Sequence, residues 1–331
     1  MGAVKTGSQI MKLRNTFYML ALFAAMYSIA HGADDYPSRP IRIIVPSPPG
    51  GGNDIMARIG AQRLSEAWSR PVIVDNRAGA GGAIAFELVA HAEPDGYTLL
   101  LGSTNLTVLP DITKVAYDPI RDFAPVSLMS TAMNILLVHP SVPADSVRQL
   151  IALAKTQPGK LMYASSSVAT SSHLAAEMFC MQAGIKMLHV PYKGNAQAMT
   201  DLMAGQESLS FPTVPSAMPH VRAKRLRALG VTGAKRAAGL PDIPTIAESG
   251  LPGYDASAWY GVLAPAGTPA AIVAKLQSEI HVALRASDIV DKLSAQGLEP
   301  APDTAEEFAR FIVAELAKWN KVIAAAGIKV E

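Results

Sequence analysis

Short β-rich runs alternate with helical runs along this chain, and that alternation restricts the fold more than any other feature of the sequence. In the first third, the strand-like runs are IRIIVP, VIVDN and YTLLLGS, and the helix-like runs between them are DIMARIGAQRLSEAW and GGAIAFELVAHA. Strands joined by helices form a mainly parallel sheet with helices on its faces. The sequence therefore predicts an α/β fold.

The same rhythm returns in the middle of the chain, where strands are predicted at LMYASS, LHVPY and LRALGVT with helices before and between them. SLMSTAMNILLVHPSVPA lies between the two α/β units and is too long for one strand, and SAWYGVLAPAGTP follows the second unit. Two such stretches are typical of a chain that crosses to another lobe and back. We expect a discontinuous first lobe, residues 33–132 and 257–331, a second lobe, residues 133–256, and a ligand cleft between them.

The N-terminal segment predicts export. Lys12 and Arg14 precede an apolar stretch over residues 17–29, and small residues follow it. This is the order of a secretory signal peptide, and the stretch is shorter than the roughly 20 residues that span a bilayer. We expect residues 1–32 to be cleaved; a membrane anchor or a buried helix is the alternative.

The composition argues against several classes of function. Lys and Arg number 29 against 27 Asp and Glu, and no basic patch with interleaved aromatic residues is visible, so no nucleic-acid partner is expected. The single cysteine, Cys180, excludes an intramolecular disulfide and lies in a helical run that predicts an inert, packed thiol. The seven histidines have no metal-ligand spacing, so we expect no metal and no cofactor.

The stretch VPSPPGGGNDIMAR, residues 45–58, is the first candidate binding loop. Its prolines keep the chain out of helical geometry, its glycines permit close ligand approach, and Asn53 or Asp54 can cap the helix that follows. The free N–H groups at the start of that helix suit a carboxylate or a phosphate, and a bare turn is the alternative. No Gly-Lys-Ser/Thr follows, so a nucleotide phosphate is not expected.

Polar clusters follow three other predicted strands. GSTNL, from Gly102, offers hydroxyl and amide groups to a ligand where its strand ends, and a plain polar loop is the alternative. HVPYKG offers Lys193 either to a ligand or to solvent. ASSSVATSSHLAAE, from Ala164, can cap a helix with a residue from 170–172 and present its other hydroxyl groups to the cleft as a nest of neutral donors. It has no G-x-S-x-G elbow, so a serine nucleophile with His173 as its base is not favoured. AGAGGAIA has Ile84 where a dinucleotide fingerprint needs glycine, which indicates a structural turn.

Several long motifs, in the same order, resemble the periplasmic solute receptors of tripartite tricarboxylate transporters, the Bug/TctC-like family. The resemblance runs from about Tyr36 to Glu331 and is carried by YPSRPIRIIVPSPPGGGNDIMAR, NRAGAGGAIAFELVAHAEPDGYTLLLGS, HLAAEMF, HVPYKG, LRALGVT, LPDIPTIAESGLPGY, WYGVLAPAGTP and KWNKVIAAAGIKVE. It implies a two-lobed type II periplasmic-binding-protein fold that closes on a small organic carboxylate.

The resemblance also implies which residues hold that carboxylate. They are backbone and hydroxyl donors with no required arginine, and residues of the second lobe read the rest of the ligand. Carried onto this sequence, the expected ligand-binding residues are Pro49, Gly50, Gly51, Gly52, Asn53, Asp54, Ser103, Thr104, Asn105, Ser165, Ser166, Thr170, Ser171, Phe211 and Thr213. The family often has an apolar residue at Ser47, Thr or Ser at Asn53, and glycines at Ser167 and Ala169, so these side chains are expected to narrow the cleft or redirect its loops.

We therefore expect a periplasmic, monomeric, non-enzymatic receptor. It would bind a di- or tricarboxylate, an amino acid or an aromatic acid by lobe closure, and deliver it to the membrane permease subunits. One alternative is a sensor that presents its ligand to a membrane signalling kinase. An alternative of another class is a secreted hydrolase that uses the serine cluster.

Overall fold

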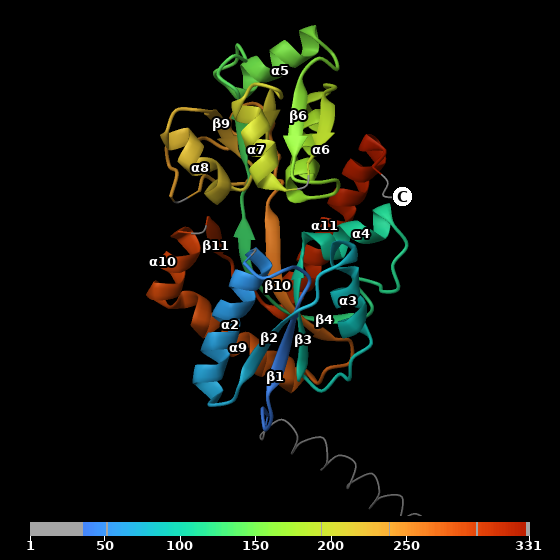
Figure 1. Ribbon diagram of the computed structural model, residues 1–331. Helices are drawn as coiled ribbons and strands as arrows, with labels where there is room; N and C mark the ends of the chain where they lie inside the picture. The colour runs from blue at the N-terminus through green and yellow to red at the C-terminus, as the bar shows by residue number, and fades with distance from the viewer. Residues whose placement is uncertain (1–35, 51, 193, 238, 296, 329–331) are drawn as a thin grey trace, which may run out of the picture.

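The strands form two separate sheets, one in each half of the molecule (Figure 1). The computed structural model describes residues 36–328 apart from residues 51, 193, 238 and 296, so the predicted signal peptide lies outside the described residues. The six-stranded sheet has the order β11 (Leu298–Pro300), β4 (Phe123–Ala132), β10 (Ala258–Pro265), β3 (Thr98–Ser103), β1 (Ile41–Val45) and β2 (Val72–Asn76). The five-stranded sheet has the order β7 (Leu188–Pro191), β6 (Met162–Ser165), β8 (Leu209–Ser210), β5 (Ile135–Val138) and β9 (Arg227–Val231).

The α/β class predicted from the sequence is confirmed, but both sheets are mixed rather than mainly parallel. β1 runs parallel to β2 and β3, and β6 runs parallel to β7 and β8. β10 lies between β3 and β4 and is antiparallel to both, and β5 is antiparallel to β8 and β9. The antiparallel pairing of β4 with β10 follows from the crossings. The chain leaves the six-stranded sheet at the end of β4 and re-enters it through β10, which runs in the opposite direction.

Both faces of the six-stranded sheet are buried, which explains its continuous apolar runs. Successive residues point to opposite faces, so Ile43 packs with Met56 and Leu276 on one side while Ile44 packs with Phe86 and Leu106 on the other. The helices that cover these two faces are α2 (Gly52–Trp68) and α9 (Ala270–Arg285) on the first, and α3 (Ala83–Ala90), α4 (Thr104–Ile112) and α11 (Ala305–Ala326) on the second.

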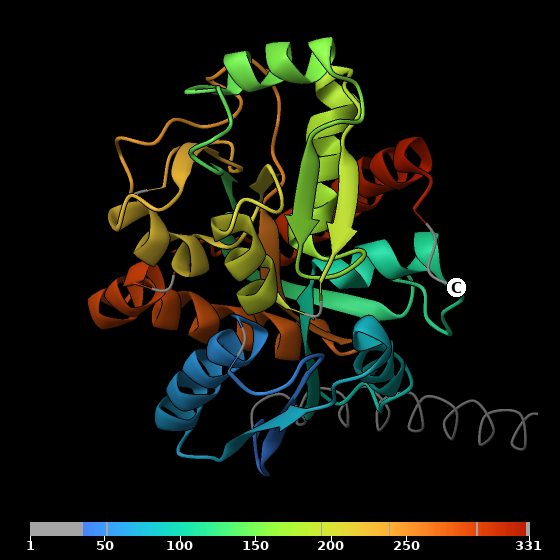
Figure 2. The same cartoon turned by 45° about the horizontal axis from the view of Figure 1, so that its top comes forward.

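The second sheet is flanked by α5, α6, α7 and α8 (Figure 2). Their bounds are Val147–Thr156, Ser171–Ala183, Asn195–Met203 and Val214–Arg222, and α10 (Ser287–Ala295) lies beside β11. Two helices, α4 and α8, were not predicted. Each contains an internal proline, Pro110 and Pro219, and a proline inside a run argues against a helix in sequence analysis.

The chain crosses between the sheets twice, within the two stretches predicted for it. β4 ends at Ala132 in one sheet and β5 begins at Ile135 in the other, and the chain returns just before β10.

α11 packs against α4 below and α6 above, so one helix bridges both halves. A capping box of Thr304 and Glu307 starts this helix and Gly327, at φ +64°, ends it. Within the described part of the chain, no helix is both long and apolar enough to cross a membrane.

Candidate ligand-binding cleft

A cavity of about 310 Å³ lies between the two halves of the molecule. Residues from the six-stranded side and from the five-stranded side both contribute to its wall. The described lining residues are all uncharged: Gly50, Gly52, Ile55, Ala132, Met133, Asn195, Thr213, Pro215, Ser216, Tyr260, Gly297 and Leu298. A charged ligand in this cavity would therefore depend on neutral donors and on helix N-termini.

The first predicted loop contributes Gly50 and Gly52 to this wall, and Gly51 lies outside the described residues. Asp54, by contrast, is 3% exposed and holds the loop in shape. Its carboxylate accepts hydrogen bonds from the Gly50 N–H at 2.9 Å, Arg58 Nε at 2.9 Å and Asn76 Nδ2 at 3.1 Å. Burial opposes ionisation of this carboxyl, but the bonds from Arg58, Gly50 and Asn76 outweigh it and keep its pKa below the usual value.

The residues that depart from the family pattern in this loop leave two oxygens unpartnered. Ser47 Oγ and Asn53 Oδ1 are buried and have no hydrogen-bond partner among the described residues. Asn53 therefore does not cap α2 through that oxygen, and the contact that shapes the start of the helix comes from Asp54 instead.

Tyr260 on β10 is the principal cleft residue that sequence analysis missed. It lies against Gly52, where a Cβ would overlap the phenol oxygen and would lie 2.9 Å from Cζ. Burial raises the pKa of Tyr260 to about 12, so its hydroxyl is protonated at neutral pH and able to donate. No described residue forms a hydrogen bond with that hydroxyl. Strand alternation predicts that Tyr260 and its two sequence neighbours point to opposite faces of the sheet. It does not predict which of those faces contacts a ligand.

The stretch after β3, for which a plain polar loop was the alternative reading, is the start of helix α4. Ser103 is the N-cap residue of α4 and Thr104 is its first residue, and both side chains are buried. Thr104 Oγ1 accepts a hydrogen bond from the Trp259 N–H at 3.3 Å, and Asn105 Nδ2 donates to the Gly81 carbonyl at 2.8 Å. None of the three lines the cavity, and their contacts join α4 to β10 and to the turn at residues 79–82.

The Ser/Thr-rich loop, residues 165–172, connects β6 to α6 and packs beside the cleft. The Ser166 carbonyl accepts from the Gly194 N–H at 2.8 Å, next to the cleft residue Asn195. Ser171 Oγ is 3.4 Å from Nδ2 of Asn134, which follows the cleft residue Met133. The loop therefore contacts residues that are adjacent in sequence to two cavity-lining residues, but it does not line the cavity itself.

The hydroxyl groups of this loop bond to one another, whereas they were expected to face the cleft. Ser166 Oγ lies 3.1 Å from both Thr170 Oγ1 and Ser172 Oγ, and Thr170 Oγ1 also donates to the Ser167 carbonyl at 2.8 Å. Thr170 occupies the N-cap position of α6 without a capping bond from its side chain. The described contacts of these hydroxyl groups are therefore within the loop itself.

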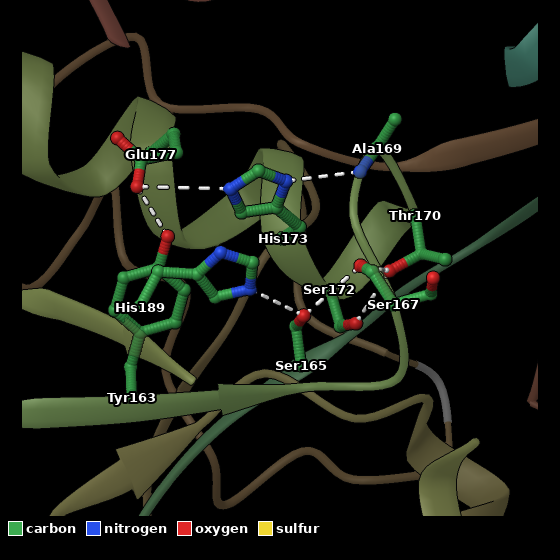
Figure 3. Close-up of polar contacts among 9 residues, drawn as sticks. All are labelled: Tyr163, Ser165, Ser167, Ala169, Thr170, Ser172, His173, Glu177 and His189. Carbon is green, nitrogen blue, oxygen red and sulfur yellow. Dashed lines mark hydrogen bonds and ion pairs between the residues drawn. The ribbon is translucent and has the colours of Figure 1, made fainter. Parts of the chain in front are cut away.

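Three rings, those of Tyr163, His189 and His173, stack beside the loop (Figure 3). The Tyr163 and His189 rings are 4.9 Å apart and the His189 and His173 rings are 3.9 Å apart, with interplanar angles of 15° and 9°. Tyr163 also donates to Glu177, whose Oε1 lies 3.8 Å from His173 Nε2. Burial lowers the pKa of His173 to about 3 and that of His189 to about 4, so both rings are neutral at pH 7.

The hydrogen bonds of Ser165 argue against a serine nucleophile. Ser165 Oγ lies 2.6 Å from His189 Nε2, the spacing of a nucleophile and its base, but the serine is fully buried. Its single proton is donated to the Ser167 carbonyl at 2.9 Å, so His189 must donate from Nε2 and has no lone pair for that proton. Ser166, the other candidate, bonds to Thr170 and Ser172 and not to a histidine.

The two residues expected to read the rest of the ligand have different positions. Thr213 lines the cavity at the start of α8, but Phe211 is fully buried and packs against Phe179 in the core. The side chain of Asn134 is also fully buried and its Oδ1 has no described partner. Among the described residues, no group of three His, Cys, Asp or Glu side chains is placed to hold a metal ion.

Comparison with known proteins gives one consistent family. The family model described as "tripartite tricarboxylate transporter family receptor" matches residues 56–328. The chain is 43% identical over 300 residues to a Pseudomonas sp. (strain P51) protein, the "UPF0065 protein in tcbD-tcbE intergenic region", covering 89% of this chain and 88% of that one.

Solved structures agree with that match. Rpa4515 of R. palustris, solved with adipate, is 37% identical with a TM-score of 0.76, covering 89% of this chain and 99% of that one. The periplasmic binding protein BugD is 30% identical with a TM-score of 0.72, covering 89% and 100%. The two-lobed periplasmic-binding-protein architecture expected from the sequence is therefore confirmed.

Proposed function

This chain belongs to the tripartite tricarboxylate transporter receptor family, a family of solute-binding proteins, and from that premise we propose that it captures a small organic carboxylate in the cleft between its lobes. The observation that carries the proposal is the interlobe cavity, which is lined by Gly50 and Gly52 at the start of α2 and by the Tyr260 hydroxyl. A helix N-terminus and a neutral phenol both favour an anion over a cation. The R. palustris relative that was solved with adipate supports an acid of this kind.

The mechanism is lobe closure. The cavity wall is divided between residues 50–132 and 260–298 on one side and residues 133–216 on the other, so an acid that touches both sides binds the closed form more tightly. We assign residues 33–132 and 257–331 to the first lobe and residues 133–256 to the second, with the two crossings as the hinge. We propose that the acid is carried unchanged, which is supported by the burial of Ser165 and by its bond to the Ser167 carbonyl.

We further propose that the mature receptor is a periplasmic monomer that delivers its acid to the permease subunits of a tripartite transporter. The signal-like pattern of residues 1–32 supports export. N-terminal sequencing of the secreted protein tests this part, with a mature terminus expected between His31 and Asp34. Recovery of the intact N-terminus from the membrane fraction would contradict it.

A thermal-shift screen tests the ligand class. The purified mature protein is heated with adipate, malate, glutamate, citrate and benzoate, and with glucose and spermidine as controls. We expect at least one carboxylate to raise the melting temperature in a concentration-dependent way, because a ligand that binds only the folded state stabilises it. Stabilisation by glucose or spermidine, with no response to any acid, would overturn the proposal.

A further inference from the structure

The stacked histidines hold the Ser/Thr-rich loop at two separate points. The Ala169 N–H donates to His173 Nδ1 at 3.0 Å, near the C-terminal end of the loop. The Ser165 hydroxyl, at its N-terminal end, lies 2.6 Å from His189 Nε2. The histidines themselves come from α6 and β7, which are packed elements of the second lobe (Figure 3). The loop is thus anchored to a rigid base and not only to itself.

The directions of these bonds fix the tautomer of each ring. His173 accepts at Nδ1, so its proton is on Nε2 and faces Glu177. His189 donates from Nε2, because the Ser165 proton is used on the Ser167 carbonyl. The bond accepted at His173 Nδ1 requires that this imidazole be neutral. Two stacked rings whose centres are 3.9 Å apart cannot both carry a positive charge without strong repulsion.

Ala169 shows why the loop needs this support. Its φ is +59°, in the left-handed region that disfavours any residue with a Cβ. It is also 8% exposed, and its N–H points to the His173 ring and not to solvent. Without the His173 acceptor, the buried N–H would lose its partner and the residue would be free to leave this conformation.

We propose that His173 and His189 are positioning residues for the acid, because they fix the path of residues 165–172 at the edge of the cleft. The inference rests on the proposed function, since it assumes that this loop meets the carboxylate when the lobes close. His173 acts through Ala169 and His189 acts through Ser165, and neither touches the acid directly. The bond to His173 Nδ1 holds Ala169 in its left-handed conformation, so ligand affinity depends on that acceptor as long as residue 169 carries a Cβ.

Among the described residues, Glu177 is the acidic group beside the pair, 3.8 Å from His173 Nε2. In the described part of the chain, the titratable groups beside the rings are Tyr163 on β6 and Glu177 on α6, and Cys180 on α6 lies near both of these groups. Burial raises the pKa of all three, so the tyrosine and the thiol stay neutral and Glu177 gains its proton more readily than an exposed glutamate. A proton on His173 Nδ1 would also place two donors, that proton and the Ala169 N–H, against each other.

Two variants of His173 distinguish the effect of its hydrogen-bond acceptor on ligand affinity from the effect of its side-chain volume. His173→Leu removes the acceptor and fills the space, whereas His173→Asn keeps an oxygen near the position of Nδ1. Adipate binding is measured by calorimetry at pH 7.5, with His91→Leu, an exposed histidine far from the cleft, as the matched control. We expect His173→Leu to weaken adipate binding at least tenfold, and His173→Asn and His91→Leu to stay within threefold of wild type.

A second variant distinguishes positioning from general stability. Ala169→Gly removes the backbone strain, since glycine adopts φ near +59° freely. In the His173→Leu background it should restore affinity to within threefold, even if the melting temperature stays low. Retained affinity in His173→Leu, or a loss that Ala169→Gly does not relieve, would overturn the inference. If wild type itself binds no carboxylate, the proposed function fails instead.

If His173→Leu does not fold, nuclear magnetic resonance of the wild-type protein together with a Ser165→Ala variant tests the inference instead. ¹⁵N shifts of the wild-type rings at pH 7 should show both histidines neutral, with protons on Nε2. Ser165→Ala should then weaken adipate binding severalfold without changing the His173 tautomer. A protonated ring at pH 7, or unchanged affinity in Ser165→Ala, would contradict the inference.

Discussion

Tyr260 occupies the space in which a side chain at residue 52 would begin. A Cβ on Gly52 would overlap the phenol oxygen and would lie 2.9 Å from Cζ, so only glycine allows the ring to close over the start of α2. The pair joins β10 to α2 within one wall of the cavity. Glycine is therefore needed at residue 52 because it leaves space for the Tyr260 ring, and not because of its backbone conformation.

Tyr260→Phe tests the donor directly. The hydroxyl has no hydrogen-bond partner among the described residues, so its loss should leave the unfolding free energy of the unliganded protein within about 0.5 kcal/mol of wild type. Adipate binding should weaken about five- to tenfold, the loss expected for one hydrogen bond of about 1–1.5 kcal/mol. Calorimetry and urea unfolding measure the two quantities, and equal affinity in both proteins would remove Tyr260 from the ligand contacts.

Gly52→Ala should weaken binding more strongly, because the new methyl group pushes the Tyr260 ring away from the start of α2. The effect should be smaller in the Tyr260→Phe background, where the overlapping oxygen is gone. A double-mutant cycle on adipate affinity measures this coupling, which we expect to exceed about 0.5 kcal/mol. Additive effects would show that the two residues act independently.

Asp54→Asn should destabilise the protein by about 1–3 kcal/mol, because a buried carboxylate that accepts three hydrogen bonds is lost. The pKa of Asp54 is lowered in the folded state, so its contribution is present above the unfolded value near 3.8 and is lost as pH falls through the lower folded value. Urea unfolding at pH 7 is the measurement, with the exposed Glu66→Gln as control. Wild-type stability in Asp54→Asn would contradict the account of this loop.

Phe211→Ala should behave as a core truncation. The ring is fully buried against Phe179, so we expect a loss of about 3–5 kcal/mol in unfolding free energy. In the fraction that remains folded, adipate affinity should be unchanged. A selective loss of affinity, with stability preserved, would place Phe211 at the ligand as the family resemblance implied.

The two buried histidines predict an acid-sensitive fold. The folded pKa values of His173 and His189 are about 3 and 4, below the unfolded value of 6.5, so the unfolded chain takes up protons first as pH falls. The contribution of the two neutral rings to the free energy of unfolding is therefore fully present above pH 6.5. It decreases as the pH falls toward 4, by at most about 1.4 kcal/mol per pH unit for each ring. Urea unfolding at pH 7.0 and 5.5 measures the slope. His173→Asn should reduce it, and an unchanged slope would show that His173 is not responsible.

Most elements were predictable because hydrophobic periodicity is local. VIVDN became β2 with the predicted ends, and the runs around residues 147 and 305 became α5 and α11. The start of α4 was missed, because Thr104, Asn105 and the internal Pro110 all resemble a loop. Tertiary burial of Leu106 and Val108 overrides that local preference.

The site was less predictable because its wall comes from segments far apart in the sequence. The Gly-rich loop and Thr213 could be proposed from helix-start patterns, but Tyr260, Met133 and Leu298 carry no local signal of ligand contact. The contact between Ser165 and His189 depends on the register of β6 and β7, which pairs Tyr163 with His189. Register is set by the whole sheet, so no motif in either strand reveals it.

The central claim is that a carboxylate binds at the start of α2 in the interlobe cleft. Its most direct test is a calorimetric titration of adipate into the wild-type protein and into Gly52→Ala, side by side at pH 7.5. We predict saturable binding at one site per chain for the wild type, and an affinity at least tenfold weaker for Gly52→Ala with its fold retained. Equal affinity in the two proteins would contradict the claim.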